Sequence, residues 1–463
     1  MPFPLKMNGI IKITLILGLL IALANPSIAY SQASKVHEKV LDNGLKILVK
    51  EDHRSPVVVS QVWYKVGSSY EYGGITGISH MLEHMMFKGT EKHSVGEFSR
   101  IIAENGGNEN AFTSRDYTAY FQTMDKSRLA ISFELEADRM RNLKLLKTEL
   151  DKELQVVREE RRMRTDDKPR SKTYEYLTAM AFTNSPYQIP VIGWPSDIES
   201  YKIEDLQQWY EQWYAPNNAT LIVIGDIEPE QVFKLAEQHF GPLKPETIVP
   251  AKPQSELPQV GVRRTTIKLP AKLPYLLMGY KVPVFNNIEH EWEAYALEVL
   301  AGILDGGNSA RLQSRLVRGK QIAVSASASY SLFSRLPDLF TLSATPTVGI
   351  STLSLEFALK DEIQQLQNQL VDPEELETIK AQVLAQAIYQ RDSMFYQGMI
   401  LGILETVGVG WQKADQYVDK VSSVTAQQVR EVARKYLVED HLNIAIMEPQ
   451  AIKTEQPGGN HAN

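Results

Sequence analysis

Two histidines and a glutamate within five residues are the side chains of this sequence best suited to chemistry. They are His80, Glu83 and His84 in the segment His-Met-Leu-Glu-His. On an α-helix, positions i, i+3 and i+4 lie on one face, so these three side chains would point the same way. Imidazole nitrogens are good zinc ligands, and a neighbouring carboxylate can accept a proton from a zinc-bound water. The spacing therefore predicts a helix that presents a zinc ion and a base together.

A catalytic zinc ion typically has three protein ligands and keeps a fourth position for water. The chain has no cysteine, so a carboxylate is the natural third ligand beside the two histidines. Glu153, Glu159 and Glu160 are the candidates about seventy residues downstream. Seven residues make nearly two helical turns, so Glu153 and Glu160 share a face and Glu159 points about 100° away. This spacing alone leaves the choice among them open.

Glu83 is predicted to act as general base and then as general acid, because a ligand role would compete with proton transfer. The alternative is that the histidines of the motif serve packing or lie on the surface. Unpaired polar groups in an apolar setting would cost several kcal/mol, which favours metal binding. The apolar residues around the motif are Ile78, Met81, Leu82, Met85 and Phe87.

The composition describes a globular protein and excludes several classes. A length of 463 residues suggests two to four domains, and 43% hydrophobic with 23% charged residues gives no sign of disorder. The net charge of -7 gives no reason to expect nucleic acid or an anionic membrane surface as a partner. Without cysteine, disulfides and thiolate ligands are excluded.

Residues 1–33 are predicted to be an export signal. Lys6 and Lys12 form a positive region, residues 13–24 form a short apolar run, and small residues follow at Ser27 and Ala29 or at Ser31 and Ala33. The run is shorter than the roughly twenty residues that a membrane span needs. An uncleaved N-terminal anchor is the alternative. Either version predicts a periplasmic or secreted protein.

Periodicity predicts mixed helices and strands in the first half of the chain. Residues 39–50 and 57–66 alternate and are predicted to be paired strands. A helix is expected at 78–87 and another at 95–105, followed by strands at 111–114 and 118–123. A charged helix or helix pair is expected over residues 126–164.

A pattern that occurs twice in the sequence predicts a duplicated α+β unit. A helix ending at Tyr214 and a strand reaching Ile224 are matched by a helix ending at Tyr436 and a strand reaching Ile446. The alternative is an accidental likeness, since such units are common. Six prolines between Gly241 and Pro270 predict a linker. The predicted organisation is a zinc-bearing domain at 34–245, a linker at 246–268, a homologous domain at 269–450 and a flexible tail at 451–463.

The chain resembles the pitrilysin-type inverzincin zinc peptidases, a family that includes insulin-degrading enzyme and the β subunit of mitochondrial processing peptidase. It is most similar to the short bacterial members, and the likeness covers essentially everything after the leader. The order H-x-x-E-H, with the glutamate before the second histidine, is the family signature. The matching segments are Val66-Gly-Ser, residues 76–90, residues 106–113, Val157-Arg-Glu-Glu with Asp167 and Pro169, and Ser185-Pro-Tyr with Gly193.

The resemblance implies roles for named residues. His80, His84 and Glu160 would bind one zinc ion, Glu83 would be the base and Glu153 an accessory glutamate that supports the site. Asn110 and Ala111 would lie in an edge strand that pairs with the backbone of a peptide substrate. The implied fold is two tandem homologous α+β domains, each a mostly antiparallel sheet covered by helices. Such domain pairs face each other or meet a partner's pair and enclose a chamber.

One departure from the family pattern concerns substrate binding in the second half. Active members carry an arginine followed six or seven residues later by a tyrosine that polarises the substrate carbonyl. Arg318 fits the arginine, but Val324 stands at the tyrosine position and has no donor for an oxyanion. Because some family members are split pairs, the chain is predicted to be the zinc-bearing subunit of a heterodimer, with a homodimer as the alternative.

Three functions compete. The first is a zinc endopeptidase that cuts peptides or unfolded segments in an enclosed chamber. The second is a non-catalytic structural or assembly subunit, for which the intact motif would be unnecessary. The third is a dedicated processor of one small precursor peptide.

Overall fold

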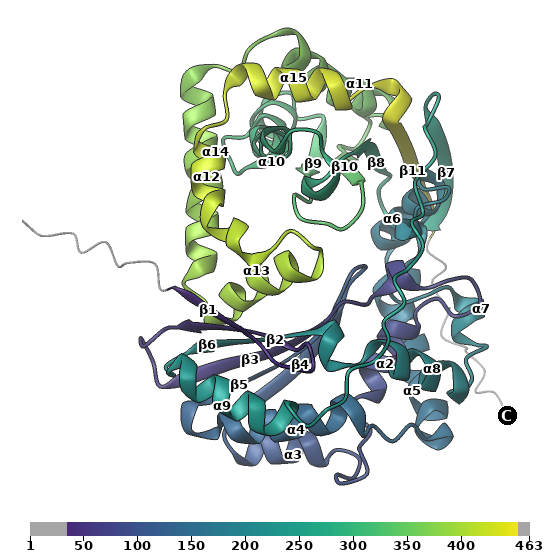
Figure 1. Ribbon diagram of the computed structural model, residues 1–463. Helices are drawn as coiled ribbons and strands as arrows, with labels where there is room; N and C mark the ends of the chain where they lie inside the picture. Colours follow the sequence, from purple (N-terminus) through teal and green to yellow (C-terminus); the bar gives the residue numbers. More distant parts are fainter. Residues whose placement is uncertain (1–34, 452–463) are drawn as a thin grey trace, which may run out of the picture. The chain divides into compact units, whose positions relative to one another are not determined.

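Two mixed sheets organise the chain in the computed structural model, which describes residues 35–451 (Figure 1). Both sheets belong to one compact unit that begins at Val36. The predicted export signal and, apart from Ala451, the predicted tail lie outside the described residues. The first sheet has the order β1-β2-β6-β3-β5-β4. Its strands are β1 (Val36–Val40), β2 (Lys46–Glu51), β3 (Val57–Tyr64), β4 (Asn108–Thr113), β5 (Thr118–Asp125) and β6 (Ala219–Gly225).

The second sheet repeats the topology of the first. Its order is β7-β11-β8-β10-β9, and it lacks only a counterpart of β1. In both sheets the first and last strands of the repeat are parallel, and all other pairs are antiparallel. The predicted α+β class with two related units is therefore confirmed. The strands are β7 (Arg263–Pro270), β8 (Tyr275–Val282), β9 (Ala323–Ser329), β10 (Asp338–Pro346) and β11 (Leu442–Gln450).

The predicted pairing of residues 39–50 with 57–66 is wrong. Residues 39–50 contain the end of β1 and most of β2, which form a hairpin with each other. The turn needs Gly44, whose φ is +85° and whose missing Cβ would lie 2.8 Å from Asn217. Strand β6 lies between β2 and β3, parallel to one and antiparallel to the other. Its seven residues are all buried, as expected of a central strand.

Helices cover one face of the first sheet and carry most of its core. They are α2 (Ile78–Met85), α3 (Glu97–Glu104), α4 (Leu129–Arg141), α5 (Lys147–Arg161), α8 (Ile203–Trp213) and α9 (Pro229–Phe240). Their apolar residues pack with Leu221 and Val223, which point to one side of β6. The adjacent Ile222 and Ile224 belong to a separate cluster on the other side, because side chains alternate along a strand.

Each sheet receives one helix from the other half of the chain. Helix α13 (Met394–Thr406) packs on the second face of the first sheet, where Leu401 meets Trp63 and Ile222. The approach is close, since a Cβ on Gly402 would lie 2.1 Å from the Trp63 ring. In return, α6 (Pro169–Ala181) contacts β7, β8 and β11. Its Leu177 joins a cluster with residues of the second sheet such as Leu277, Leu339 and Ala445.

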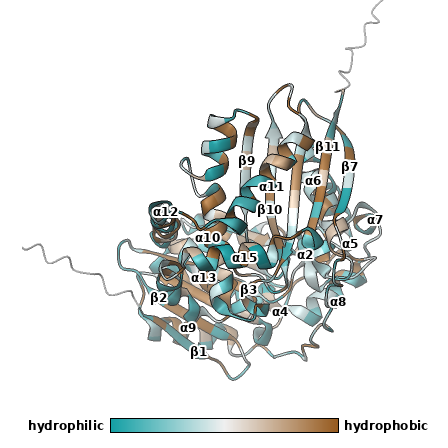
Figure 2. Cartoon of the chain, turned by 90° about the horizontal axis from the view of Figure 1, so that it is seen from above, coloured by the Kyte–Doolittle hydropathy of each residue, from teal (hydrophilic) through white to brown (hydrophobic). Residues whose placement is uncertain are grey.

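The other face of the second sheet is covered by its own helices. Figure 2 shows hydrophobic residues along the strands β10 and β11 of this sheet. The helices of this half are α10 (Glu291–Asp305), α11 (Thr352–Asn368), α12 (Pro373–Arg391), α14 (Tyr417–Ser422) and α15 (Ala426–Tyr436), with a π-helical segment at Leu312–Gly319. None of the helices within residues 35–451 combines the length and the apolar content that a membrane span requires.

The predicted linker at 246–268 is too long at its C-terminal end. Residues 241–262 contain no helix or strand, but β7 begins at Arg263 and pairs with β11. Most of the prolines that indicated a linker precede this point, and only Pro270 lies in the strand, as its last residue. Proline lacks the N–H that a central strand would need. An enrichment in proline therefore indicates only the segment without regular structure, and not where the next strand begins.

Candidate metal centre

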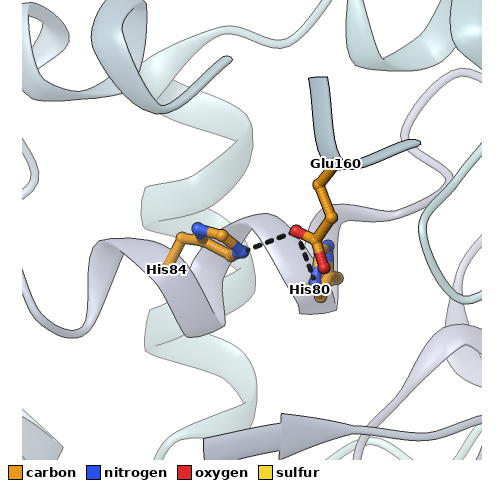
Figure 3. Close-up of side chains that lie close together, drawn as sticks. All are labelled: His80, His84 and Glu160. Carbon is orange, nitrogen blue, oxygen red and sulfur yellow. Dashed lines mark ion pairs between the residues drawn. The ribbon is translucent and has the colours of Figure 1, made fainter. Parts of the chain in front are cut away.

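Helices α2 and α5 bring together both predicted histidines and one of the three candidate glutamates (Figure 3). Glu160 Oε2 lies 3.6 Å from His80 Nε2 and 3.3 Å from His84 Nε2. His80 is buried, whereas His84 and Glu160 are half-buried. Among the residues 35–451, this is the group of ligand atoms that combines convergence with burial.

The three atoms are spaced as ligands of one tetrahedral zinc ion would be. Zinc–nitrogen and zinc–oxygen bonds of about 2.0–2.2 Å place neighbouring tetrahedral ligands about 3.3–3.6 Å apart. Both measured separations agree with that geometry. Two imidazoles and a carboxylate are also the donor set of known catalytic zinc sites. The side chains present therefore fit this metal.

The N-terminus of α2 is held where the motif needs it. Gly77, just before the helix, has φ of +87°, and a Cβ there would lie 2.5 Å from the Ile192 oxygen. The buried carboxylate of Glu71 accepts hydrogen bonds from the N–H groups of Gly77 and Ser79, at 2.6 and 2.9 Å. These bonds satisfy donors that would otherwise be unpaired at a helix start.

Glu153 lies behind His84 and contacts it without joining the group of ligands. His84 Nδ1 donates to Glu153 Oε2 at 3.1 Å, and Lys88 Nζ lies 2.6 Å from Glu153 Oε1. A proton fixed on Nδ1 leaves Nε2 free to bind a metal, which is the usual arrangement for zinc-bound histidine. Glu159 faces away and pairs with Arg162, so the geometry separates the three glutamates.

The two histidines differ in their electrostatic surroundings. Burial, together with the neighbouring His84, lowers the pKa of His80 to about 4. Burial also acts against the charged form of His84, but its hydrogen bonds with Glu153 and Glu160 raise its pKa to about 9. The Nδ1 atom of His80 is buried and has no hydrogen-bond partner among the described residues.

Glu83 points toward the same space from the next position on the helix face. Thr113 Oγ1, at the end of β4, donates a hydrogen bond to Glu83 Oε2. Burial raises the pKa of Glu83 above its ordinary value, while the bond from Thr113 opposes that shift. Thr113 was not predicted to act on Glu83, and only its place in the matched segment 106–113 could have drawn attention to it.

The C-terminal turn of α5 is anchored by arginines that the sequence analysis did not single out. Arg161 is buried and donates to the Gly193 oxygen at 2.8 Å and to Glu175 Oε1 at 2.9 Å. Arg164 Nη1 lies 2.5 Å from Glu160 Oε1, whereas Oε2 is the oxygen that approaches the histidines. Arg164 follows Glu160 by four residues, so helical spacing could have indicated this pair.

A cavity of about 1550 Å³ opens over the site. Asn110 and Ala111 line it from β4, the edge strand of the first sheet, which pairs only with β5 within that sheet. Its walls combine charged side chains, among them Lys88, Arg115 and Glu175, with an apolar strip at 189–192. The cavity is therefore large enough for a peptide segment, and an unpaired strand edge lies along its wall.

Arg318 is not brought to this site. It lies in the segment Leu312–Gly319, donates to the Asn308 oxygen and is absent from the residues that line the cavity. Val324 lies on β9, the edge strand of the second sheet, and is 55% exposed. Within the described residues, the second half therefore supplies the cavity with neither an arginine–tyrosine pair nor a substitute for it.

A second group of possible ligands is formed by Glu51, His53 and Glu228. It lies on the surface, and His53 Nδ1 already lies 2.6 Å from Asp226 Oδ1. Exposed groups of this kind commonly occur without a metal, so we assign no role to it.

Comparison with known proteins identifies the family. A model described as insulinase (peptidase family M16) matches residues 46–194, and one described as peptidase M16 inactive domain matches residues 200–383. The zinc protease PqqE of Helicobacter pylori is 34% identical over 383 residues, which cover 81% of this chain and 84% of that protein. The chain belongs to peptidase family M16. The predicted resemblance to pitrilysin-type zinc peptidases is thereby confirmed.

Solved structures of bacterial proteases share the fold. A protease from Helicobacter pylori superimposes with a TM-score of 0.85 at 30% identity, covering 90% of this chain and all of that one. The periplasmic protease PqqL of Escherichia coli gives a TM-score of 0.76 at 19% identity, and the match covers 90% of this chain but 49% of PqqL. This M16 chain is thus a zinc-dependent peptidase by family, and its residues 200–383 match a domain described as inactive.

Proposed function

We propose that this chain is a zinc endopeptidase whose catalytic centre is the group described above. His80, His84 and Glu160 would hold one zinc ion per chain, and Glu83 would be the general base. The observation that carries the proposal is the convergence of three ligand atoms with a half-buried glutamate beneath a peptide-sized cavity. A bound zinc ion would supply Lewis acidity that lowers the pKa of a water molecule to about 7.

The residues of the chain would perform the remaining work. The outward N–H and C=O groups of β4 would pair with an extended peptide, so that backbone contacts at Asn110 and Ala111 hold it beside Glu83. The N–H of Ala111, which donates to Asn110 Oδ1 at 2.9 Å, would exchange that bond for one to the peptide. Glu83 would take a proton from the attacking water as the water oxygen bonds to the carbonyl carbon of the peptide. It would then give that proton to the amine as the C–N bond breaks. Glu153 would keep His84 in the orientation and tautomer that the site requires.

The glutamine variant Glu83→Gln tests the assignment directly. It should keep one zinc ion per chain by metal analysis and lose about 10²–10⁴-fold in the rate of peptide cleavage, because no base remains. Glu104→Gln, an exposed change on α3, is the matched control and should cleave normally. Normal cleavage by Glu83→Gln would refute the role of Glu83. A wild-type chain that binds no zinc, or that cleaves no peptide even with a partner chain, would instead favour a structural subunit.

We further propose that the chain works with a second chain of the same fold. Support comes from the missing arginine–tyrosine pair and from PqqL, of which this chain covers 49%, leaving room there for a second copy of the fold. A partner, either a homologous chain or a second copy, would complete an enclosed chamber in which size limits the substrates. Light scattering and cleavage assays on the purified chain, alone and with a candidate partner, test this. Full activity of a monomer would contradict it.

We also propose that the protein acts in the periplasm or outside the cell. The support is the predicted export signal at residues 1–33, which lies outside the described part of the chain. Cell fractionation and N-terminal sequencing of the mature protein would test both the location and removal of the leader. Recovery of the intact chain from the cytoplasm would contradict this proposal.

A further inference from the structure

A second cavity, of about 600 Å³, lies in the second half of the chain and shares no residue with the cavity over the metal centre. This volume is within the usual range for sites that hold small molecules, about 300–1,000 Å³. Helices α10, α12 and α13 and the segment 328–333 form its walls. Gln386 and Gln390 of α12 are exposed at its margin, so solvent can reach it from that side.

One carboxylate in this cavity lacks a proper partner. Glu298 is the only charged residue between Ala294 and Leu304 of α10, a stretch that is otherwise apolar apart from Tyr295. Its Oε2 atom is buried and has no hydrogen-bond partner among the described residues. Its Oε1 atom is 3.4 Å from the hydroxyl of Tyr417, a long hydrogen bond. No lysine, arginine or histidine within residues 35–451 forms an ion pair with it.

A carboxyl group that is buried without a hydrogen-bond partner lowers the stability of the fold. Buried polar groups without partners destabilise a fold by about 1–3 kcal/mol, and charged groups by more. Burial raises the pKa of Glu298 to about 7, so near neutral pH the group is poised between its two forms. A ligand that carries a positive charge and N–H donors would supply both missing interactions.

The other walls favour an apolar body on that ligand. Tyr330, Phe333 and Tyr417 present aromatic rings, and Ile400 and Ile403 add aliphatic surface. Aromatic faces also attract cations, which strengthens the preference for an ammonium group near Glu298.

One positive side chain limits where the ligand's charge can lie. Arg391 lines the cavity and donates to the Ala414 oxygen at 2.9 Å. An ammonium group would be repelled there and attracted to the two carboxylates of the cavity, Glu298 and Asp305. Asp305 already accepts hydrogen bonds from Gln313 and from the Ala328 N–H, so Glu298 is the acid that is left for the ligand. The other end of the ligand can be neutral or can carry a carboxylate.

We propose that this cavity binds a small organic amine, with its ammonium group against Glu298 and an apolar body against Tyr330, Phe333 and Tyr417. Hydrophobic amines and hydrophobic amino acids share this chemistry and differ only in the group that would face Arg391. The site is separate from the metal centre, so binding does not depend on peptide cleavage.

Binding of four related probes to the full chain tests the proposal. The probes are phenethylamine, L-phenylalanine, 2-phenylethanol and 3-phenylpropionate. Saturation-transfer NMR and calorimetry measure the binding of each. We expect phenethylamine to bind and the alcohol and the acid to bind at least about 10-fold more weakly, because only the amine replaces the missing partner of Glu298. Tighter binding of L-phenylalanine than of phenethylamine would mean that its carboxylate contacts Arg391. Weaker binding would mean that the cavity prefers an amine without a carboxylate.

Two variants and a control make the result decisive. Glu298→Gln should weaken amine binding at least about 10-fold, while Glu431→Gln on the exposed side of α15 should leave it unchanged. Ala387→Trp fills the cavity from its margin without changing charge and should also weaken binding. The proposal is overturned if neither ammonium compound binds up to roughly 10 mM. It is equally overturned if the alcohol binds as tightly as the amine, or if either cavity variant binds the amine like the wild type.

Discussion

Replacing Glu153 by glutamine isolates the contribution of a residue that orients a zinc ligand without binding the metal. The carboxylate accepts from His84 Nδ1 at 3.1 Å and lies 2.6 Å from Lys88 Nζ. Glutamine has the same shape but one carbonyl oxygen and no charge. If that oxygen keeps the bond with His84, the NH₂ group meets the Lys88 ammonium, donor against donor. If it turns to Lys88, His84 loses its acceptor.

The expected loss can be estimated in two ways that agree. Hydrogen bonds to charged groups contribute about 1.5–3 kcal/mol. Substitutions behind metal ligands lower affinity by about 10–100-fold, which is about 1.4–2.7 kcal/mol. We therefore expect the zinc dissociation constant of Glu153→Gln to rise about 10–100-fold. Cleavage should return to near the wild-type rate when zinc is saturating.

Competition with a chromophoric chelator measures zinc affinity in the apoprotein. Asp151→Asn is the matched control, because Asp151 is an exposed residue of α5 whose partner is Lys147. Unchanged zinc affinity in Glu153→Gln would refute the orienting role. A lower cleavage rate at full zinc occupancy would refute it too, because Glu153 would then act on the chemistry itself.

Three further changes have expected outcomes. Thr113→Val removes the donor to Glu83 and should lower kcat by about 10–100-fold at unchanged zinc content. Gly402→Ala should lower the free energy of unfolding in urea by about 1–3 kcal/mol, because a Cβ placed 2.1 Å from the Trp63 ring outweighs the helix propensity gain of about 1 kcal/mol. The pKa of Glu298 is raised by burial from 4.5 to about 7, so the folded chain holds a proton that the unfolded chain has lost between these pH values. Its contribution to stability should therefore fall as pH rises through this window, by up to about 3 kcal/mol, and Glu298→Gln should remove this slope from unfolding curves measured at several pH values.

Each of these changes has a matched control. Thr123→Val on β5, Gly73→Ala in a loop with free space around it and Glu431→Gln on α15 should behave like the wild type. A normal kcat in Thr113→Val would exclude an effect on Glu83. Equal stability of Gly402→Ala and Gly73→Ala would mean that α13 can shift away from the sheet at little cost. A pH slope shared by Glu298→Gln and the wild type would assign it to other groups.

Local periodicity was enough to predict the helix of the metal centre. The spacing of His80, Glu83 and His84 depends only on helical geometry, and α2 runs from Ile78 to Met85. Spacing also separated Glu159 from the other two glutamates. It could not distinguish Glu153 from Glu160, because both share one helix face and only the packing of α5 on α2 decides which reaches the histidines.

Strand order and long-range contacts were beyond such reasoning. The insertion of β6 between β2 and β3 joins residues about 170 positions apart, and no local pattern encodes that choice. The hydrogen bond from Thr113 to Glu83 likewise depends on how β4 meets α2. The start of β7 was missed because proline composition marks a region without marking where pairing resumes.

The exchange of α6 and α13 between the two sheets has a consequence for any attempt to divide this protein. A protease that nicked the backbone within residues 241–262 would leave two fragments, each bearing the helix that shields an apolar surface of the other. The fragments would stay together as a noncovalent complex, and either one produced alone would be prone to aggregate. The two halves of the gene could therefore evolve into separate polypeptides only as obligate companions.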